Sequence, residues 1–154
     1  MKIDTCMKRN VASIPLDTSI GEAARVMVQK HIGILPVVDD INKPVGVVHM
    51  SDLLTLELPD FLDLIKDVDF VHDFGAVETT HPGHDQLSQP VSTIMQPVKT
   101  IEEDCGLIRS YALMIHDDLY DLPVTNNAGK LVGVVSRVDI GTKLLSRWPA
   151  EDVK

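Results

Sequence analysis

The chain carries an internal repeat. Shifted by 87 residues, so that Val11 falls on Val98, it aligns with itself without a gap through Asp52 and Asp139. Identical stretches are Leu-Pro-Val at residues 35–37 and 122–124 and Val-Gly-Val-Val at residues 45–48 and 132–135. A duplicated unit of this size leaves an apolar face that its copy covers. The repeat therefore predicts two copies packed about a pseudo-two-fold axis, with two related clefts along the seam.

Size and charge narrow the classes of protein to consider. With 154 residues, 44% hydrophobic and 24% charged, the chain suits one compact domain with a substantial core. Its formal net charge of −9 disfavours non-specific binding to nucleic acid or anionic lipid, so we expect neither as a partner. No stretch approaches the roughly 20 apolar residues of a membrane span, and the N-terminus lacks the apolar run of a signal peptide. Cys6 and Cys105 do not make a disulfide framework, and we expect a cytoplasmic protein.

Each copy has the pattern strand, helix, strand, strand, helix. In the first copy, Ser19 and Glu22 have the spacing of a helix capping box, whereas in the second we expect Asp104 to be the cap, with Gly106 inside the first turn. Pairs of β-branched runs joined by Asn, Asp and Gly residues then predict hairpins. The paired runs are Ile34–Val38 with Val45–Val48, and Leu122–Thr125 with Leu131–Val135.

The repeat does not explain residues 57–90. Pro59–Val71 is predicted to be a helix with one apolar and one acidic stripe. Such an acidic stripe is typical of a solvated face and also suits a basic partner. Thr79–Gln89 contains Pro82 and Gly83 and predicts a mobile loop.

The segment from Ser136 to Asp139 follows directly on a predicted strand and opens a helix. Free backbone N–H groups at such a helix start favour a phosphate, and the Ser136 hydroxyl adds a donor. The Asp139 carboxylate can accept hydrogen bonds from both hydroxyls of a ribose, and Arg137 is expected to add local positive charge. A serine followed three residues later by an acid is also how ordinary helices cap themselves, so this alternative stays open.

The ordered set of motifs resembles the cystathionine-β-synthase (CBS) domain. In the first copy the resemblance rests on residues 33–39 (GILPVVD) and on Val45-Gly46-Val47-Val48 followed by Asp52; in the second it rests on residues 122–124 and 132–139. It implies a tandem pair, or Bateman module, of fold class α/β (α+β): two β-α-β-β-α repeats about a pseudo-two-fold axis. The boundaries that we predict are residues 1–56 for repeat 1, 57–90 for an insertion and 91–154 for repeat 2, all in one compact module.

The resemblance implies a ligand that contains adenosine, bound between the repeats. AMP, ADP and ATP are the expected ligands, with S-adenosylmethionine or NAD as alternatives. Carried over residue by residue, the preferred second site comprises Thr100, Asp121, Leu122, Pro123, Ser136, Arg137 and Asp139. The first site comprises Ser13, Ile34, Leu35, Pro36, His49 and Asp52. The resemblance also implies a homodimer, and we expect a regulatory signal that reaches an unknown effector protein in trans.

Two residues depart from a simple phosphate site. His49 stands where the family pattern has Ser or Thr. A neutral imidazole is bulkier and offers one donor, so we expect weaker phosphate binding at the first site; protonated, it would make that site sensitive to pH. The alternative is that His49 only fills the cleft. In the second site, the carboxylate of Asp121 disfavours an anion unless it meets the amino group of adenine.

Two other functions stay open at this point. The first is a ligand-free CBS pair that acts as an oligomerisation or docking module, with the acidic helix as its contact. The second is a small enzyme or metal protein built on loop histidines, since His72, Asp73, His81, His84 and Asp85 are N and O ligands at usable spacing. We find no Ser/His/Asp or Cys/His set with a supporting motif, so we predict neither catalysis nor a bound metal.

Overall fold

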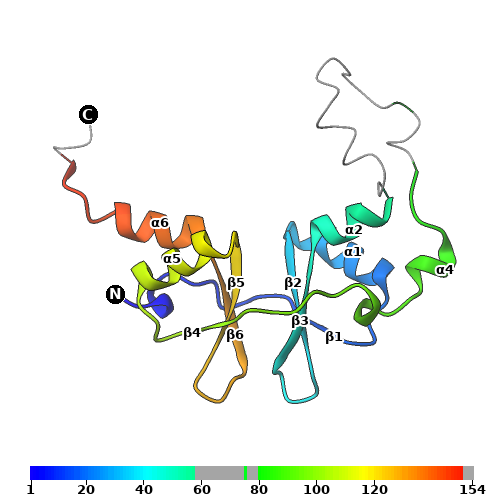
Figure 1. Cartoon of the computed structure of the whole chain (residues 1–154), viewed down its shortest axis with the longest axis horizontal. Coiled ribbons are helices and arrows are strands. Elements are labelled where there is room, and N and C mark those ends of the chain that lie inside the picture. The colour runs from blue at the N-terminus through cyan, green and yellow to red at the C-terminus, as the bar shows by residue number, and fades with distance from the viewer. Residues whose placement is uncertain (58–74, 76–79, 151–154) are drawn as a thin grey trace.

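Two small three-stranded sheets, each with two helices, lie side by side in the computed structural model of this chain (Figure 1). The structure describes residues 1–57, 75 and 80–150. The first repeat contains β1 (Ile14–Pro15), α1 (Ile20–Lys30), β2 (Ile34–Val38), β3 (Pro44–His49) and α2 (Met50–Glu57). The second contains β4 (Ile101–Glu102), α5 (Leu107–His116), β5 (Asp121–Thr125), β6 (Leu131–Ser136) and α6 (Arg137–Leu145). The predicted fold class and its β-α-β-β-α order are confirmed.

The two sheets have the same topology. In the first, β1 runs parallel to β2 and β2 pairs antiparallel with β3; β4, β5 and β6 repeat this order. The central strands are buried almost throughout, which explains their continuous apolar runs in place of an alternating pattern. A third apolar cluster, formed by Ile34, Val47 and Val134, joins the two repeats at the seam.

The two repeats start their first helices differently. The Ser19 hydroxyl accepts a hydrogen bond from the Glu22 amide at 3.1 Å, so the predicted cap of α1 is confirmed. The prediction that Asp104 caps α5 is wrong, because Gly106 is the N-cap and the helix begins at Leu107. Asp104 lies inside a turn that the Cys105 amide closes by donating to the Glu102 carbonyl, so the chain reaches helical geometry later.

Two short segments cross the seam, and we call them straps. The first strap, residues 1–8, carries a 3₁₀ turn at Ile3–Thr5 and buries Ile3 in the core of the second repeat. The second strap, residues 89–96, carries a 3₁₀ turn at Val91–Thr93 and buries Val91 in the core of the first repeat. Each repeat therefore includes a core residue from the segment that precedes the other one.

Backbone hydrogen bonds fix both straps. Lys8 and Val134 exchange two N–H···O bonds, each 2.9 Å long. Gln96 and Val47 make the equivalent pair at 2.8 and 3.0 Å. At this depth in the fold an unpaired N–H or C=O group is costly, so these pairs hold the straps in register against β6 and β3. The two repeats are in this way joined into one module.

The middle segment is described only in part. The predicted helix Pro59–Val71, with its acidic stripe, lies outside the described residues. The prediction of a loop over Thr79–Gln89 is wrong at its centre, where α4 (His84–Leu87) is a single helical turn. Its amides at Leu87 and Ser88 donate to carbonyls four residues earlier, and Leu87 packs beside Gly21 of α1, a tertiary contact that sequence pattern does not reveal. No helix of the described part is long and apolar enough to cross a membrane.

Candidate functional site

Two clefts open along the seam between the repeats. The first, which we call the Lys8 cleft, has a volume of about 410 Å³ and is lined by Lys8, Asn10, Val11, Ala12, Lys30, His31, Ile32, Gly33, Ile34, Asp121 and Val134. The second, the His49 cleft, has a volume of about 470 Å³ and is lined by Ile34, Val47, His49, Gln96, Pro97, Val98, Lys99, Asp117, Leu119, Asp121, Leu122 and Pro123. Both volumes lie in the range of about 300–1,000 Å³ that is usual for small-molecule sites.

Each cleft takes residues from both repeats, whereas each predicted site takes its residues from one repeat. Leu122 and Pro123 of the second repeat line the same cleft as His49 of the first. Ile34 and Asp121, which are equivalent in the 87-residue repeat, line both clefts. The repeat-by-repeat grouping therefore does not match the cleft walls, because strand ends from both sheets meet at the seam.

Ser136 and Asp139 form a capping box at the start of α6. The Asp139 amide donates to Ser136 Oγ at 3.0 Å, and the Ser136 amide donates to Asp139 Oδ2 at 2.9 Å. The other carboxylate oxygen, Oδ1, lies 3.7 Å from the Lys8 ammonium nitrogen. The capping alternative is thus present in the structure, yet it occupies only one oxygen of Asp139 and leaves Oδ1 directed toward a residue that lines the Lys8 cleft.

The equivalent corner of the first repeat is built from His49 and Asp52. The His49 amide donates to Asp52 Oδ2 at 2.8 Å, and its ring Nδ1 lies 3.6 Å from the same oxygen. Asp52 Oδ1 accepts a long hydrogen bond, 3.5 Å, from the side-chain amide of Gln96. Gln96 therefore lies beside Asp52 as Lys8 lies beside Asp139. The two corners differ in the imidazole of His49 and also in the strap residue, which is charged beside Asp139 and neutral beside Asp52.

The Lys8 cleft holds the more available positive charge. Lys8 is 70% exposed despite its contact with Asp139, and Lys30 makes no ion pair with any residue that the structure describes. His31 follows Lys30 and takes a left-handed conformation, with φ 53°, at the end of α1. An anionic group entering this cleft would meet two ammonium groups and a titratable imidazole, in a protein that is acidic overall.

Charge in the His49 cleft is largely paired. Lys99 forms an ion pair with Asp117, which also contacts the His116 ring at 2.8 Å. Hydrogen bonds from these two groups lower the pKa of Asp117, with Lys99 making the larger contribution. The lysine of this cleft is therefore already engaged, and the cleft suits a ligand group without a strong negative charge.

Arg137 does not serve the role predicted for it. Its guanidinium donates to the carbonyls of Leu119 (2.5 Å) and Met114 (3.0 Å) and lies over the Tyr120 ring, 4.3 Å from the ring centre. These contacts tie α6 to the turn between α5 and β5. These contacts give Arg137 a structural role in place of the predicted contact with a ligand, since Nε and Nη2 of its guanidinium donate to carbonyl groups of the same repeat.

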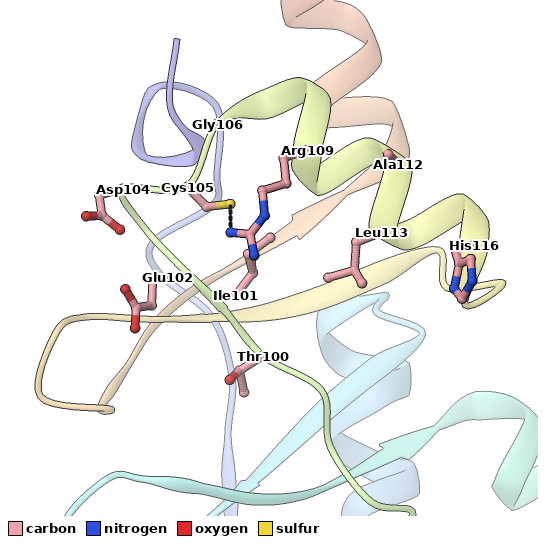
Figure 2. A pocket seen from close by; sticks show the side chains of 10 residues that line it. All are labelled: Thr100, Ile101, Glu102, Asp104, Cys105, Gly106, Arg109, Ala112, Leu113 and His116. Atoms are coloured by element: carbon pink, nitrogen blue, oxygen red, sulfur yellow. Dashed lines mark hydrogen bonds between the residues drawn. The ribbon is translucent and has the colours of Figure 1, made fainter.

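Thr100 lies apart from both clefts. It lines a larger hollow of about 770 Å³ on the outer side of the second repeat, between β4 and α5 (Figure 2). Figure 2 shows Arg109 turned toward the Cys105 sulfur, to which it donates at 3.4 Å, while Glu102 and Asp104 extend to the other side of the strand. These charged groups do not converge on one point, so we do not treat the hollow as the site.

Of the other residues predicted for the sites, some line the clefts and some lie in the core. Ile34 lines both clefts, while Leu35 is fully buried in the core of the first repeat. Pro36 is buried in β2, and Ser13 is half-buried; neither side chain lines the two clefts as the structure defines them. No three His, Cys, Asp or Glu side chains within the described residues come together in a way that could hold a metal ion. His72 and Asp73 lie outside the described residues.

Sequence reasoning missed Lys8, Lys30 and Gln96. A signal for the strap residues exists, since Lys8 and Gln96 correspond at an offset one residue longer than that of the main repeat. An alignment without gaps hides this correspondence. Lys30 has Asp117 as its partner in the repeat, so a comparison of the copies alone gave no reason to select it.

The CBS domain profile matches residues 3–58 and 91–145, which is most of the chain and includes a large part of both straps. This chain belongs to the CBS domain family. It carries two copies of the domain, as the sequence motifs indicated.

Several curated relatives match most of this chain. An uncharacterized protein of Methanocaldococcus jannaschii is 32% identical over 140 residues, which cover 90% of this chain and 31% of that protein. The chloroplastic CBS domain-containing protein CBSX2 of Arabidopsis thaliana is 26% identical over 142 residues, which cover 86% of this chain and 58% of that protein. This chain thus spans about a third to somewhat over a half of these two relatives.

Solved structures agree with the fold. The crystal structure of CBSX2 in complex with AMP matches with a TM-score of 0.70 and 26% identity, over 94% of this chain and 96% of that one. The CBS domain pair of protein MJ0100, in complex with 5′-methylthioadenosine and S-adenosylmethionine, matches with a TM-score of 0.68. At 20% identity over 96% of this chain and 98% of that one, the second match supports the fold alone.

Proposed function

We propose that this chain is a non-catalytic regulatory module that binds an adenine nucleotide or a related adenosyl ligand between its CBS repeats and signals to a partner protein in trans. The observation that supports it most directly is the Lys8 cleft, which is lined by Lys8 and Lys30 and whose Lys8 ammonium nitrogen lies 3.7 Å from Asp139 Oδ1 in the first turn of α6. The similarity to CBSX2, whose crystal structure is titled as a complex with AMP, supports the same class of ligand.

The proposed binding mode assigns one role to each group. The start of α6, with the Ser136 hydroxyl, faces the phosphate, and Lys8 and Lys30 provide opposite charge. Asp139 Oδ1 accepts hydrogen bonds from the ribose, while Ile32 and Ile34 provide apolar surface for the base. The His49 cleft, with its paired lysine, takes a ligand that is less anionic or stays empty.

Thermal unfolding in the presence of ligands tests the proposal. The panel contains AMP, ADP, ATP, NAD, S-adenosylmethionine and cyclic dinucleotides. A ligand at 100 times its dissociation constant stabilises the fold by about 2.7 kcal/mol, which is a clear rise in Tm. We expect Asp139→Ala to remove the rise, Asp52→Ala to reduce it less, and Asp40→Ala, at the exposed hairpin, to leave it unchanged. If no member of the panel raises the Tm, the sensor function is wrong and the docking module takes its place.

We further propose that the module is a homodimer formed through its helices. Large apolar side chains on the helical face are exposed, including Val28 (77%), Ile108 (69%) and Val138 (73%). Exposed apolar groups gathered on one face mark interaction surfaces. In Figure 1 the helices α1, α2, α5 and α6 lie away from the turns of the two hairpins, so Ile41, which is exposed in the turn between β2 and β3, offers a matched control.

Sedimentation equilibrium provides the test of the dimer. Val138→Glu places a charge in the proposed contact and is expected to shift the mass toward that of the monomer, whereas Ile41→Glu leaves the dimer intact. A wild-type chain that stays monomeric at all concentrations would contradict the proposal. The ligand experiment above does not depend on this outcome.

A further inference from the structure

Asp121 has an unusual position for a carboxylate. It is the first residue of β5 and lines both the Lys8 cleft and the His49 cleft. Its counterpart in the first repeat is Ile34, which belongs to the apolar cluster at the seam together with Val47 and Val134. The second repeat thus places an acid where the first places a hydrophobic side chain, at the centre of the interface.

The surroundings of Asp121 disfavour its charge. Burial raises the pKa of the Asp121 carboxyl and is the largest effect; the neighbouring charge of Asp139 raises it further, while Lys8 and His49 lower it. No side chain or amide of the described residues donates a hydrogen bond to this carboxyl. Other charged or titratable residues of the two clefts are Lys30 and His31 on one side and Lys99 and Asp117 on the other.

The strand register places Asp121 beside the proposed phosphate position. Asp121 is the cross-strand partner of Ser136, the N-cap of α6, and the start of α6 is where the proposed function puts the phosphate. A phosphate and an ionised carboxylate at adjacent positions repel one another. A phosphate bound there makes protonation of Asp121 more favourable, and protonation of Asp121 makes phosphate binding more favourable by the same factor.

We propose that Asp121 is a specificity-determining residue whose protonation is linked to phosphate binding. A ligand with a phosphate binds the Lys8 cleft with uptake of a proton by Asp121, whereas adenosine binds without this proton uptake. This inference rests on the proposed function and adds the selection between phosphorylated and unphosphorylated ligands. We expect removal of the Asp121 charge to strengthen AMP binding about tenfold at a pH where Asp121 is ionised, which is within the usual range of coupling between two sites.

Isothermal titration calorimetry with AMP and adenosine tests the linkage. Titrations between pH 5 and 8, in pairs of buffers with different ionisation enthalpies, give the number of protons taken up at each pH. The proteins are wild type, Asp121→Asn, Asp121→Ile and the charge-matched control Asp40→Asn, a residue exposed at the hairpin. Because the phosphate of AMP also titrates near pH 6, and His31 and His49 are present in every variant, the difference between wild type and the Asp121 variants isolates this carboxyl.

The expected results separate this inference from the function on which it rests. Wild type and Asp40→Asn take up more protons with AMP than either Asp121 variant, and both Asp121 variants bind AMP about tenfold more tightly at pH 8. Adenosine affinity changes less than about twofold. Equal proton uptake and equal AMP affinity in wild type and Asp121→Asn overturn the linkage while leaving the proposed function in place. Absence of binding by both AMP and adenosine refutes the proposed function and the linkage together.

Discussion

We expect an added methyl group at Gly133 to cause a large loss in the free energy of unfolding. A Cβ atom placed there would lie 2.5 Å from the Lys8 carbonyl oxygen and 3.3 Å from the Met7 sulfur, whereas ordinary contacts are 3.4–4 Å. The Lys8 carbonyl cannot turn aside, because it accepts the Val134 amide at 2.9 Å. Gly133→Ala must therefore push the first strap away from β6.

The cost of Gly133→Ala follows from what the strap contributes. Overpacking of this kind typically costs 1–3 kcal/mol. Full release of the strap would lose its five backbone hydrogen bonds to the second repeat, at about 1 kcal/mol each, and the burial of Ile3 at about 1.5–3 kcal/mol, so partial displacement is the less costly response. We expect a loss of about 2–3 kcal/mol in the free energy of unfolding.

Gly46 offers a comparison within the same molecule. A Cβ atom there would lie 2.5 Å from the Met95 sulfur, at the end of a flexible side chain, and 3.3 Å from the Gln96 carbonyl oxygen. Met95 can adopt another rotamer, so Gly46→Ala should cost about 1 kcal/mol. Equilibrium unfolding in urea, with m-values compared for two-state behaviour, measures both variants. Equal losses at the two glycines, or none at Gly133, would show that the strap is not held as described.

Three further changes have definite expected results. Gly141→Ala, in α6 where the new Cβ meets nothing within 4 Å, should raise the free energy of unfolding by about 0.5–1 kcal/mol, and a decrease would contradict the open space there. Ser136→Ala removes the side-chain acceptor of the Asp139 amide and should cost about 1 kcal/mol in the same urea titration. Asp121→Asn should become increasingly stabilising relative to wild type as pH rises through the pKa of Asp121 in the folded state. A carboxyl group whose pKa is raised by folding contributes stability only while it is protonated, so wild type loses this stability as pH rises and Asp121→Asn does not. Thermal unfolding of both proteins from pH 4 to 8 measures the difference in stability, and a difference that does not change with pH would contradict the prediction.

The sequence was sufficient for the elements whose stability is local. The run Ile34–Val38 became β2 with the predicted bounds, and the capping pair Ser19 and Glu22 started α1 as expected. Continuous apolar runs and cap spacing act through neighbouring residues, so they can be interpreted without knowledge of the tertiary structure. Where a tertiary contact decides the outcome, as for α4 against Gly21, the local pattern pointed to a loop.

The site was less accessible to sequence for a similar reason. His49, which lines one cleft, and Asp139, whose Oδ1 lies beside Lys8 of the other, could be selected from the sequence because their motif positions recur in both copies. The grouping of residues into sites depends on which strand ends meet at the seam, and this is a property of the packing of two sheets. Arg137 shows the limit most clearly: its position after Ser136 suggested a ligand contact, yet nearby carbonyls and Tyr120 engage it first.

The straps determine why the two clefts are unequal. If the repeats were packed without them, the corners at Asp52 and Asp139 would still differ through His49 and Ser136. Because residues 1–8 cross to the second repeat and residues 89–96 cross to the first, Asp139 faces an ammonium group while Asp52 faces an amide. A phosphate ligand in the Lys8 cleft would then contact a strap that is itself hydrogen-bonded to β6, so its binding energy would add to the attachment of one repeat to the other. The same ligand in the His49 cleft would also contact a strap, through Gln96, but would meet an amide there in place of an ammonium group. The straps therefore make the two clefts differ in charge rather than in their attachment to the sheets.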